Sequence, residues 1–577
     1  MLQIEGLSKR YRLKDRDIVA LDNISLAARP GEILGIVGKS GGGKSTLMKI
    51  LRGMEDFDSG RIILDDLTIT PDSGEDVKKQ QMAVTAIHLQ RDFALWTETA
   101  LKNVVRRVKA RKTGYEALPI PEDADYDELY QEAMSYLRLV GLDSKAQHLA
   151  TILSGGEKQR LLIARQLAKK PKVLLLDEPA TMACPATKQD VLDAIKNVNR
   201  ELNLTTIVVS HLPEIHEYLA DRLIWLDKGK IVAEGEPKEI LDRFLAGIGK
   251  MEPLASWPDS QPLIKVRGLS KRGCQICVGE VLNVLKMEDL NFDINEHEIT
   301  SIIGNSGGGK TTLLKIMQGV RLPDEGSVCY RYEDKWVDMV VYSPERMNVR
   351  RSLGIMYQEF ALYAGETILD QIAYKMGIKG NDVIDQARAV AEEMGISDKV
   401  LDIIYGMTDM SEEDAKAALE ALGLTRDIFQ ELFPRFPTTE ARKYAEPIFD
   451  LISLDREAMW KLPRQLSGGE LVRASLAIIL AARPKILILD EPFGDIDPIT
   501  MREVSNAIKK INAEFGTTII LVSHHVEFIK EISHRAMLIE NGAITADGDP
   551  ARVCNAFLSS CNAPYLKHLE ERYKNQG

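Results

Sequence analysis

Two stretches of the chain decide its fold: GEILGIVGKSGGGKSTLMKILRG at 31–53 and HEITSIIGNSGGGKTTLLKIMQG at 297–319. Each one has an apolar, strand-like run before a glycine-rich segment of the form G-x-x-x-x-G-K-[ST], and a helix-like run after it. In such a loop the backbone N–H groups close around phosphate oxygens, the lysine adds positive charge and the hydroxyl reaches Mg²⁺. The sequence therefore predicts two nucleotide-binding loops.

The repeat continues beyond the loops. LSGGEKQR in the first half matches LSGGELVR in the second, VLLLDEP matches ILILDEP, and VVSH matches LVSH. Gln358 lies 268 residues after Gln90, whereas Ser467 lies 313 residues after Ser154, so the second half holds 45 additional residues between these two positions. The chain is thus one unit written twice, with an insertion in the second copy.

The composition is that of a folded protein. Of the 577 residues, 45% are hydrophobic and 28% are charged, and 74 Lys+Arg against 86 Asp+Glu give a net charge of −12, which disfavours a nucleic-acid partner. The N-terminus has no apolar export segment, and no apolar run is long enough to span a bilayer. Six unevenly spaced cysteines agree with a reducing compartment. We therefore expect a cytoplasmic protein without a membrane span.

The order of these motifs resembles that of the ATP-binding cassette (ABC) ATPases over nearly the whole chain. The resemblance implies an α/β fold of two tandem P-loop nucleotide-binding domains, each with a parallel-sheet ATPase core, an antiparallel β subdomain and a helical signature subdomain. Strands such as KVLLLD and TTIVVS alternate with helical patterns, which by itself indicates a parallel sheet covered by helices. We expect a first domain at 1–250, a linker at 251–262, and a second domain at 263–577 with an enlarged helical insertion at about 375–462.

Two acidic pairs follow apolar strands. Asp177 and Asp490 end these strands, where they are placed to hold a magnesium shell, and the adjacent Glu178 and Glu491 are placed to polarise an attacking water. The alternative interpretation is a pair of solvated acids after a buried strand. Their position beside the other motifs favours the catalytic one.

The family resemblance assigns further roles and implies ATP and Mg²⁺ as cofactors. The resemblance implies that His211 and His524 contact the γ-phosphate and that Gln90 and Gln358 reach the metal. It also implies that the SGG signature of each cassette caps the phosphate bound by the opposite cassette. Site one would then pair Lys44 with Ser467, and site two would pair Lys310 with Ser154. The catalytic candidates are Glu178, Glu491, His211 and His524, and the magnesium candidates are Ser45, Gln90, Asp177, Thr311, Gln358 and Asp490. The nucleotide-binding candidates are Tyr11, Gly38, Lys39, Ser40, Gly41, Gly42, Gly43, Lys44, Ser45, Thr46, Gly304, Asn305, Ser306, Gly307, Gly308, Gly309, Lys310, Thr311, Thr312, Ser154, Gly155, Gly156, Ser467, Gly468 and Gly469.

Two departures from the family pattern both concern site two. Family members carry an aromatic near the start that stacks on adenine. LSKRY supplies Tyr11, whereas the repeat reads LSKRG and leaves Gly273, unless an aromatic from the following segment fills the gap. The turn after the glutamate holds Asp497 in the second half but Cys184 in the first. We therefore expect unequal sites, with turnover at site one and slow firing or mere retention of nucleotide at site two.

Two further features stay open. Cys274 and Cys277 form a CxxC, which is half a tetrahedral metal site, so they are either ordinary thiols or a metal or redox pair. The insertion contains amphipathic patterns such as SEEDAKAALEALGL and TTEARKYAEPIFDLI, which indicate a helical bundle. That bundle is either a docking surface or a plain local core.

The amino-acid sequences of three segments indicate a particular subfamily of the ABC ATPases. DEPATMACPATKQD, DEPFGDIDPITMREVSNAIKKINAEFGTTIILVSHHVEF and ELFPRFPTTEARKYAEPIF closely resemble the component A2 family of the methyl-coenzyme M reductase system in methanogenic archaea. That resemblance implies ATP-dependent reductive activation of the reductase, whose nickel cofactor F430 is brought to Ni(I). Its activation complex, including iron–sulfur proteins, would be the partner. The alternative function is the ATPase subunit of an ABC importer that docks on a separate membrane permease.

Overall fold

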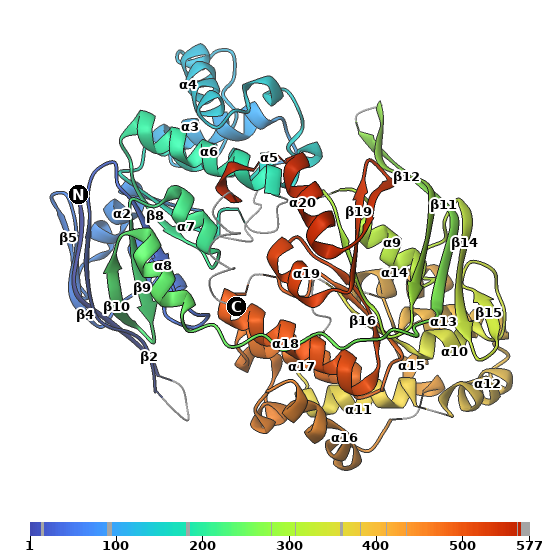
Figure 1. The fold of residues 1–577 in the computed structure, drawn as a ribbon. Helices are drawn as coiled ribbons and strands as arrows, with labels where there is room; N and C mark the ends of the chain where they lie inside the picture. Colours follow the sequence, from blue (N-terminus) through green and yellow to red (C-terminus); the bar gives the residue numbers. More distant parts are fainter. Residues whose placement is uncertain are drawn as a thin grey trace. The chain divides into compact units, whose positions relative to one another are not determined.

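The computed structural model of the chain describes residues 1–12, 17–88, 95–180, 185–277, 280–305, 307–357, 362–380, 382–410, 412–433, 435–494, 496–561 and 563–566, with only the backbone described within 274–285 and at 412. The chain divides into two compact units. The first comprises Met1–Ile248 with Asp497–Ile499 and Cys561–Gly577, and the second comprises Gly249–Ile496 with Thr500–Ser560. Each unit is one copy of the same α/β cassette (Figure 1).

The first cassette has two sheets. The larger one has the strand order β10-β9-β3-β8-β7-β6 and is parallel except for the β9–β10 pair. Its strands are β3 (Ile33–Val37), β6 (Thr85–His88), β7 (Val173–Asp177), β8 (Thr205–Val209), β9 (Arg222–Asp227) and β10 (Lys230–Gly235). The smaller sheet is antiparallel in the order β2-β1-β4-β5, from β1 (Leu2–Arg12), β2 (Asp17–Ala28), β4 (Ser59–Leu64) and β5 (Leu67–Ile69).

The central strands β3, β7 and β8 are buried along their whole length, as expected for parallel strands covered on both faces. The helices of this cassette are α1 (Lys44–Leu51), α2 (Glu75–Val84), α3 (Ala100–Thr113), α4 (Tyr126–Leu139), α5 (Gly155–Leu167), α6 (Pro185–Leu202), α7 (Pro213–Leu219) and α8 (Pro237–Leu245). Because β3, β8 and β7 are parallel neighbours, their carboxyl ends meet at one edge of the sheet. The glycine-rich loop, the acidic pair and the histidine all follow these ends, so the topology gathers them.

The second cassette repeats both sheets. Its larger sheet has the order β16-β17-β18-β13-β19-β20, from β13 (Ile299–Ile303), β16 (Leu353–Met356), β17 (Ile486–Asp490), β18 (Thr518–Val522), β19 (Arg535–Glu540) and β20 (Ala543–Gly548). Its antiparallel sheet has the order β12-β11-β14-β15, from β11 (Pro262–Cys277), β12 (Glu280–Asn295), β14 (Glu325–Tyr332) and β15 (Lys335–Asp338). The predicted α/β class, with a parallel core and an antiparallel β subdomain in each copy, is confirmed.

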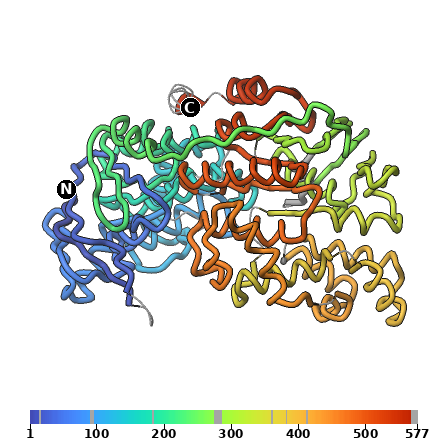
Figure 2. The backbone as a smooth tube through the Cα atoms, turned by 60° about the horizontal axis from the view of Figure 1, so that its bottom comes forward, coloured from blue at the N-terminus to red at the C-terminus, as the bar shows by residue number. Residues whose placement is uncertain are grey.

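The helices of the second cassette include several in the range that is predicted to hold the insertion. They are α9 (Lys310–Met317), α10 (Arg346–Arg351), α11 (Ile368–Lys379), α12 (Val383–Glu393), α13 (Asp398–Met407), α14 (Glu412–Leu422), α15 (Asp427–Leu432), α16 (Thr438–Leu451), α17 (Gly468–Leu480), α18 (Pro498–Phe515), α19 (Val526–Ile532) and α20 (Pro550–Cys561). Helices α12 to α15 close around a core of their own that contains Ile384, Leu401, Tyr405 and Phe433. The insertion is therefore a helical bundle with a local core. Figure 2 shows the path of these helices from another side.

The segment expected to be a linker is fastened to the second cassette. Trp257 Nε1 donates to Asn512 Oδ1 at 3.1 Å, and the Glu252 carbonyl accepts from Lys509 Nζ at 2.7 Å. Asn512 and Lys509 both belong to α18. The Trp257 ring also packs against His297, with 4.6 Å between ring centroids. The green trace of this segment accordingly follows α18 (Figure 2). No helix within the described ranges is long and apolar enough to cross a membrane.

Candidate nucleotide sites

The glycine-rich loop of the first cassette has the form needed to surround phosphates. Gly43, directly before α1, has φ 102°, a left-handed conformation that glycine adopts without steric cost. Lys44 begins α1, and its Nζ donates to the carbonyl oxygens of Gly38 at 2.7 Å and Lys39 at 2.9 Å. The ammonium therefore lies inside the loop, where burial lowers the pKa of Lys44. The N-terminus of α1 adds a positive helix-dipole end to the same place.

The second loop repeats this geometry. Gly309 has φ 87° before α9, and Lys310 Nζ donates to Gly304 O and Asn305 O, both at 2.9 Å. Thr311 is the second residue of α9, as Ser45 is in α1. Ser306, which belongs to the predicted loop set, lies outside the described residues.

Both predicted magnesium carboxylates are buried at strand ends. Asp177 ends β7 and Asp490 ends β17, with exposed fractions of 8% and 4%. Burial raises the pKa of both acids, although Ser45 and Thr311 oppose the shift by donating hydrogen bonds to Asp177 and Asp490 respectively. The loop hydroxyl and the strand-end acid thus meet in each cassette. This is the arrangement that a shared cation needs.

The glutamates beside them are held in a strained conformation. Glu178 and Glu491 both have φ 51°, in the left-handed region that costs a non-glycine residue free energy. In the first cassette Glu178 is fixed from two directions: Ser210 Oγ donates to it at 3.0 Å and the backbone N–H of His211 at 2.7 Å. Sequence reasoning missed Ser210, although it directly precedes the predicted histidine in VVSH. Both carboxylates are buried, at 3% and 7% exposed.

The histidine side chains lie at different distances from these glutamates. His211 Nε2 is 3.5 Å from Glu178 Oε1, whereas His524 Nε2 is 2.9 Å from Glu491 Oε1. Burial, followed by the charge of Lys44, lowers the pKa of His211 to about 3, so this ring is neutral at pH 7. Burial alone would raise the pKa of Glu491, but the charge and hydrogen bond of His524, together with His525 and Lys310, lower it below its usual value. The two sites therefore differ in the coupling of histidine to glutamate.

The signature serines are helix caps. Ser154 precedes α5 and Ser467 precedes α17, and each forms a reciprocal capping box, with Glu157 and Glu470 respectively. This geometry presents a positive helix N-terminus beside the first glycine of each motif. Neither serine shares its cassette with the loop it is predicted to serve, so its role toward phosphate remains a prediction.

The two signature glycines have different surroundings. A Cβ on Gly156 would lie 1.9 Å from Thr187 Cγ2, and one on Gly469 would lie 2.1 Å from Thr500 Cγ2. A Cβ on Gly155 would meet nothing within 4 Å. The second glycine is thus required for close packing inside its own cassette, and Thr187 and Thr500 are the packing partners that the sequence did not indicate.

Tyr11 is placed beside the first loop. Its hydroxyl is 3.5 Å from Thr46 Oγ1, on the helix that follows the loop, and Lys9 Nζ lies 5.1 Å from its ring centroid. In the second cassette Gly273 occupies β11 opposite Leu285. The residues that follow it are described by backbone alone, so the alternative that a neighbouring aromatic replaces Tyr11 stays a prediction.

Several predicted residues lie outside the described part of the chain: Gln90, Cys184 and Gln358. Cys274 and Cys277 have a described backbone within β11, where they pair with Asn283 and Glu280 on β12, and nothing is stated of their side chains. Within the described ranges, no group of three or more His, Cys, Asp or Glu side chains could hold a metal ion as a cluster.

Comparisons with known proteins point to one family. The model of the ABC transporter family matches residues 21–181 and 287–494. An uncharacterized ABC transporter ATP-binding protein of Methanocaldococcus jannaschii is 45% identical over 582 residues, which cover 100% of both chains. A methionine import ATP-binding protein of Oceanobacillus iheyensis is 32% identical over 240 residues, 42% of this chain and 68% of its own. Among solved structures, RNase-L Inhibitor shares the fold with a TM-score of 0.56 at 18% identity, over 96% of this chain and 93% of that chain.

Proposed function

We propose, for a chain that belongs to the ABC transporter family and hydrolyses ATP with Mg²⁺, that its ATPase cycle performs conformational work on methyl-coenzyme M reductase. Family membership carries ATP binding, hydrolysis and magnesium dependence. The proposal adds the partner, whose nickel cofactor F430 must reach Ni(I), and a cytoplasmic location. Iron–sulfur proteins of the activation complex supply the electrons.

The residues at each loop fit a magnesium nucleotide. Lys44 and Lys310 project ammonium groups into their loops, and within the described residues Asp490 Oδ1 is buried without a hydrogen-bond partner. A buried carboxylate oxygen of this kind is costly unless a cation or donor meets it. Asp177 and Asp490, with Ser45 and Thr311, would hold the ion, which neutralises charge on the outer phosphates when bound.

The two glutamates act as general bases in ATP hydrolysis. Glu178 and Glu491 orient the attacking water and accept its proton. Ser210 and the His211 backbone hold the Glu178 carboxylate in place, so it needs no rearrangement before it acts. The sites are composite: Lys44 works with the signature of Ser467, and Lys310 with that of Ser154. ATP binding then joins the cassettes, and hydrolysis releases them.

One observation supports the choice of partner. The sequences of the two DEP segments and of the insertion in the second cassette together resemble those of the component A2 family. The full-length relative from Methanocaldococcus jannaschii, matched over 100% of both chains, agrees with a setting in methanogenic archaea. A tandem chain without a described membrane-crossing helix also suits an ATPase that acts on a separate complex.

Reactivation of the reductase tests the proposal. Purified, inactive methyl-coenzyme M reductase is incubated with a low-potential reductant, its iron–sulfur proteins, ATP and this chain. We expect the electron paramagnetic resonance signal of Ni(I) and methane formation with the wild-type chain. The Lys44→Ala/Lys310→Ala variant should give neither, because it lacks the positive charge at both loops. Equal reactivation by this variant would contradict the proposal, and unchanged ATP hydrolysis in it would mean that the sites are misplaced.

A second candidate function is the ATPase subunit of an ABC importer. The likeness of one cassette to a methionine import ATP-binding protein favours it. An importer ATPase binds permease helices, whereas the activation role requires nickel and iron–sulfur proteins. Affinity purification of the tagged chain from its own cells separates the two. A co-purifying membrane permease would defeat the activation role, and co-purifying reductase subunits would support it.

A further inference from the structure

A pocket of about 620 Å³ lies between the ATPase core and the insertion of the second cassette. Its walls come from the end of β16, from α11, from the α13–α14 connection, from α15 and from the signature helix α17. The volume falls within the range of about 300–1,000 Å³ that is typical of small-molecule sites. Because its α13–α15 wall belongs to the insertion and its described lining contains no residue of the nucleotide loop, this pocket is a separate feature of the second cassette.

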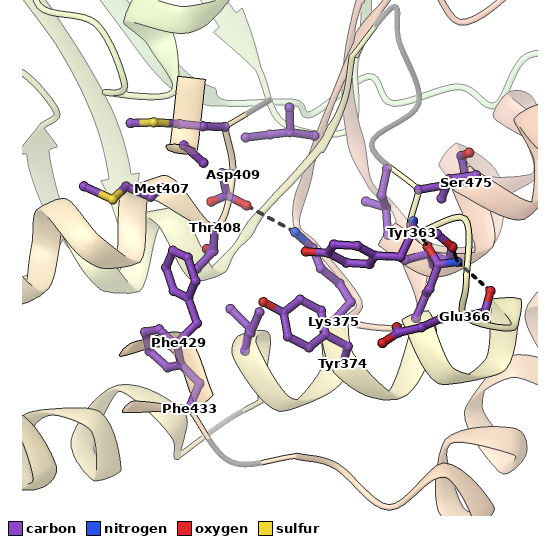
Figure 3. A pocket seen from close by; sticks show the side chains of 18 of the residues that line it. Tyr363, Glu366, Tyr374, Lys375, Met407, Thr408, Asp409, Phe429, Phe433 and Ser475 are labelled. Carbon is purple, nitrogen blue, oxygen red and sulfur yellow. Dashed lines mark hydrogen bonds and ion pairs between the residues drawn. The ribbon is translucent and has the colours of Figure 1, made fainter. Parts of the chain in front are cut away.

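Aromatic rings form much of the wall. Tyr363 and Tyr374 meet edge to face with 5.8 Å between ring centroids, and Phe429 and Phe433 line the opposite side (Figure 3). Met407 adds a thioether to the same lining, and its sulfur packs favourably against aromatic rings. These side chains offer a large apolar surface that suits another ring, either stacked with an offset or edge to face.

Polar side chains of the lining bond within the protein. Gln371 is 3% exposed and exchanges two hydrogen bonds with the backbone of Tyr363, at 3.1 and 3.0 Å. Ser475 donates to a carbonyl of its own helix α17 at 2.8 Å, and Thr408 donates to the last turn of α13 at 2.7 Å. The donors of these groups are therefore used without a ligand, and the segment at Tyr363 keeps its shape.

The floor of the pocket is an ion pair. Lys375 Nζ reaches Asp409 Oδ1 at 3.2 Å (Figure 3), and Lys379 Nζ, which lies outside the lining, binds the other oxygen of Asp409 at 2.6 Å. The positive and the negative group that line the floor thus bind each other. A ligand that brought a charge to this depth would lose its hydration, while both charged groups there already have partners.

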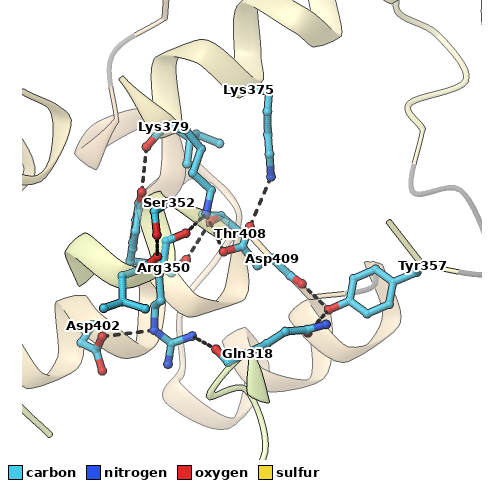
Figure 4. Close-up of polar contacts among 12 residues, drawn as sticks. Gln318, Arg350, Ser352, Tyr357, Lys375, Lys379, Asp402, Thr408 and Asp409 are labelled. Carbon is cyan, nitrogen blue, oxygen red and sulfur yellow. Dashed lines mark hydrogen bonds and ion pairs between the residues drawn. The ribbon is translucent and has the colours of Figure 1, made fainter. Parts of the chain in front are cut away.

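A buried network anchors this floor to the nucleotide-binding core (Figure 4). Lys379 Nζ also donates to the Arg350 carbonyl at 2.7 Å, and Arg350 donates to the carbonyls of Gln318 at 3.1 Å and Gly319 at 2.8 Å, just after α9. The Tyr357 hydroxyl bonds both the Gln318 side chain and the Asp409 carbonyl. The floor is consequently preorganised, which reduces the cost of binding a ligand above it.

The remaining charged residues of the lining are of both signs. They are Glu366, Arg426 and Arg435. Both arginines are exposed, and Arg426 is already engaged in an interaction within the protein. These residues therefore mark the solvent side of the pocket, and its depth is left to the rings, the aliphatic side chains and the paired floor.

The signature helix of the first cassette is polar at the equivalent positions. Ile478 and Ile479 of α17 line the pocket, and the residues 313 positions earlier, on α5, are Arg165 and Gln166. Arg165 donates to both carboxylate oxygens of Glu116, at 3.1 and 3.0 Å. The first cassette thus has an ion pair where the second has aliphatic side chains, so the apolar lining distinguishes the second cassette.

We propose that this pocket binds an uncharged, largely apolar ring molecule, which lies between the tyrosine and phenylalanine rings above the paired floor. Removal of its apolar surface from water and contact with the aromatic walls supply the affinity. The site goes beyond the proposed activation role and does not rest on it, because binding needs neither the reductase nor ATP hydrolysis.

Two fluorescent probes test the site on the full chain. The neutral probe is N-phenyl-1-naphthylamine, and the anionic one is 8-anilinonaphthalene-1-sulfonate, which has the same rings with a sulfonate added. Mg-ADP is present throughout to fill the nucleotide sites. We expect saturable binding of the neutral probe at one site per chain. The anionic probe should bind at least about tenfold more weakly, because its sulfonate loses hydration in the pocket.

Three variants locate the bound probe. Ala415→Trp places a large ring into the pocket from α14 and should abolish binding, with basal ATP hydrolysis unchanged. Phe429→Leu keeps the wall apolar but removes one ring, and should weaken the neutral probe about three- to tenfold. Arg442→Gln removes an exposed arginine of α16 that pairs with Glu446 outside the pocket lining, and should change nothing.

The proposal fails if the wild-type chain shows no saturable binding of the neutral probe, or if that binding survives Ala415→Trp. It also fails if the anionic probe binds as tightly as the neutral one. Should Ala415→Trp not fold, Phe429→Leu decides, and an unchanged affinity in that variant would place the probe elsewhere. A wild-type chain that binds neither probe, but captures a protein that Ala415→Trp does not, would assign the pocket to a protein side chain and overturn the proposal.

Discussion

The first cassette connects β6 to its signature helix α5 through α3 and α4, whereas the second connects β16 to α17 through α11 to α16. The sheets on either side keep the same strand order in both copies. The loop lysines, strand-end acids and capped signature serines also repeat closely. The chemistry of the nucleotide thus constrains the core, while the helical region is free to acquire a second core, a buried ion network and a pocket.

Replacing the glutamates one at a time is the sharpest test of this comparison. Glu178→Gln should reduce steady-state ATP hydrolysis by at least about 100-fold, the scale of a lost general base, and Glu491→Gln by less than about tenfold. The reason is that we expect Gly273 and Cys184 both to weaken site two, which would leave most of the turnover to site one. Radiolabelled ATP hydrolysis and nucleotide exchange at each site measure it. The asymmetry fails if both variants lose turnover equally.

The buried network of the second cassette should dominate its stability. Asp409→Asn leaves Lys379, which is 3% exposed, without its carboxylate, so we expect a loss of about 3–5 kcal/mol in the free energy of unfolding. Urea unfolding followed by hydrogen exchange in α11 measures it. Glu446→Gln, which breaks surface pairs with Arg442 and Arg456, is the matched control and should cost under about 1 kcal/mol. Equal effects would show that the network is no more than a surface pair.

The Asp409 carboxylate should also make the free energy of unfolding depend on pH. Burial alone would raise the pKa of Asp409, but Lys379 and Lys375 hold it below its usual value. A lowered pKa in the folded state means that this contribution is present above about pH 4 and is lost as the pH falls toward the folded pKa. In Asp409→Asn this part of the acid sensitivity should disappear.

Changing the residue at the predicted adenine-stacking position should make the nucleotide affinities of the two sites more alike. Tyr11→Ala removes a ring that contacts the loop helix, and we expect its site to lose roughly 1–3 kcal/mol of nucleotide affinity, about 5- to 150-fold. Gly273→Tyr should have the opposite effect and raise the nucleotide affinity of site two. Titration with fluorescent ATP in the Lys310→Ala and Lys44→Ala backgrounds isolates each site. An unchanged affinity after Tyr11→Ala would remove the stacking role.

The smallest expected effect concerns a lysine that only the first cassette carries. Burial, followed by the charge of Arg107, lowers the pKa of Lys169 to about 7, and the equivalent position in the second cassette, 313 residues later, is Ala482. Between pH 7 and about 10 the unfolded chain binds the proton that the folded chain lacks, so stability rises with pH in this window. Lys169→Ala should stabilise the first cassette by about 1 kcal/mol below pH 7, and this gain should fade toward pH 10.

Calorimetry at pH 6.5 and 9.5 measures this effect. The control is Lys170→Ala, which removes an exposed lysine that pairs with Glu132 at 3.1 Å. Its effect on the melting temperature should be small and unfavourable. A gain in Lys169→Ala that does not diminish at pH 9.5 would rule out titration as its cause.

Much of the fold and of the loop chemistry could be predicted because the signals are local. The glycines before Lys44 and Lys310, and the acids after two apolar strands, are contiguous in sequence, and the alternation of strands with helices predicts a parallel sheet covered by helices. The local core of the insertion settles only one of its two interpretations, since a bundle with a core can still present a docking surface. The composite pairing of each loop with the opposite signature stays a prediction.

Residues that act through distant partners escaped prediction. Ser210 holds Glu178 from 32 residues away, and Thr187 requires glycine at position 156 from the following helix. Tyr357 joins Gln318 to Asp409 across a sequence separation of more than fifty residues. No local sequence pattern predicts such contacts, because serine, threonine and tyrosine each occur in many structural settings.

From its sequence alone the chain is a tandem ATPase with two nucleotide loops, since binding phosphate and magnesium requires particular residues at short fixed spacings. Tertiary structure alone decides that Lys375, Lys379 and Asp409 form the charged floor of an aromatic pocket, and that this floor is anchored to the end of α9. The physical reason is burial. A charge taken out of water must find its partner wherever the packed helices bring one, and that place is a property of the whole fold.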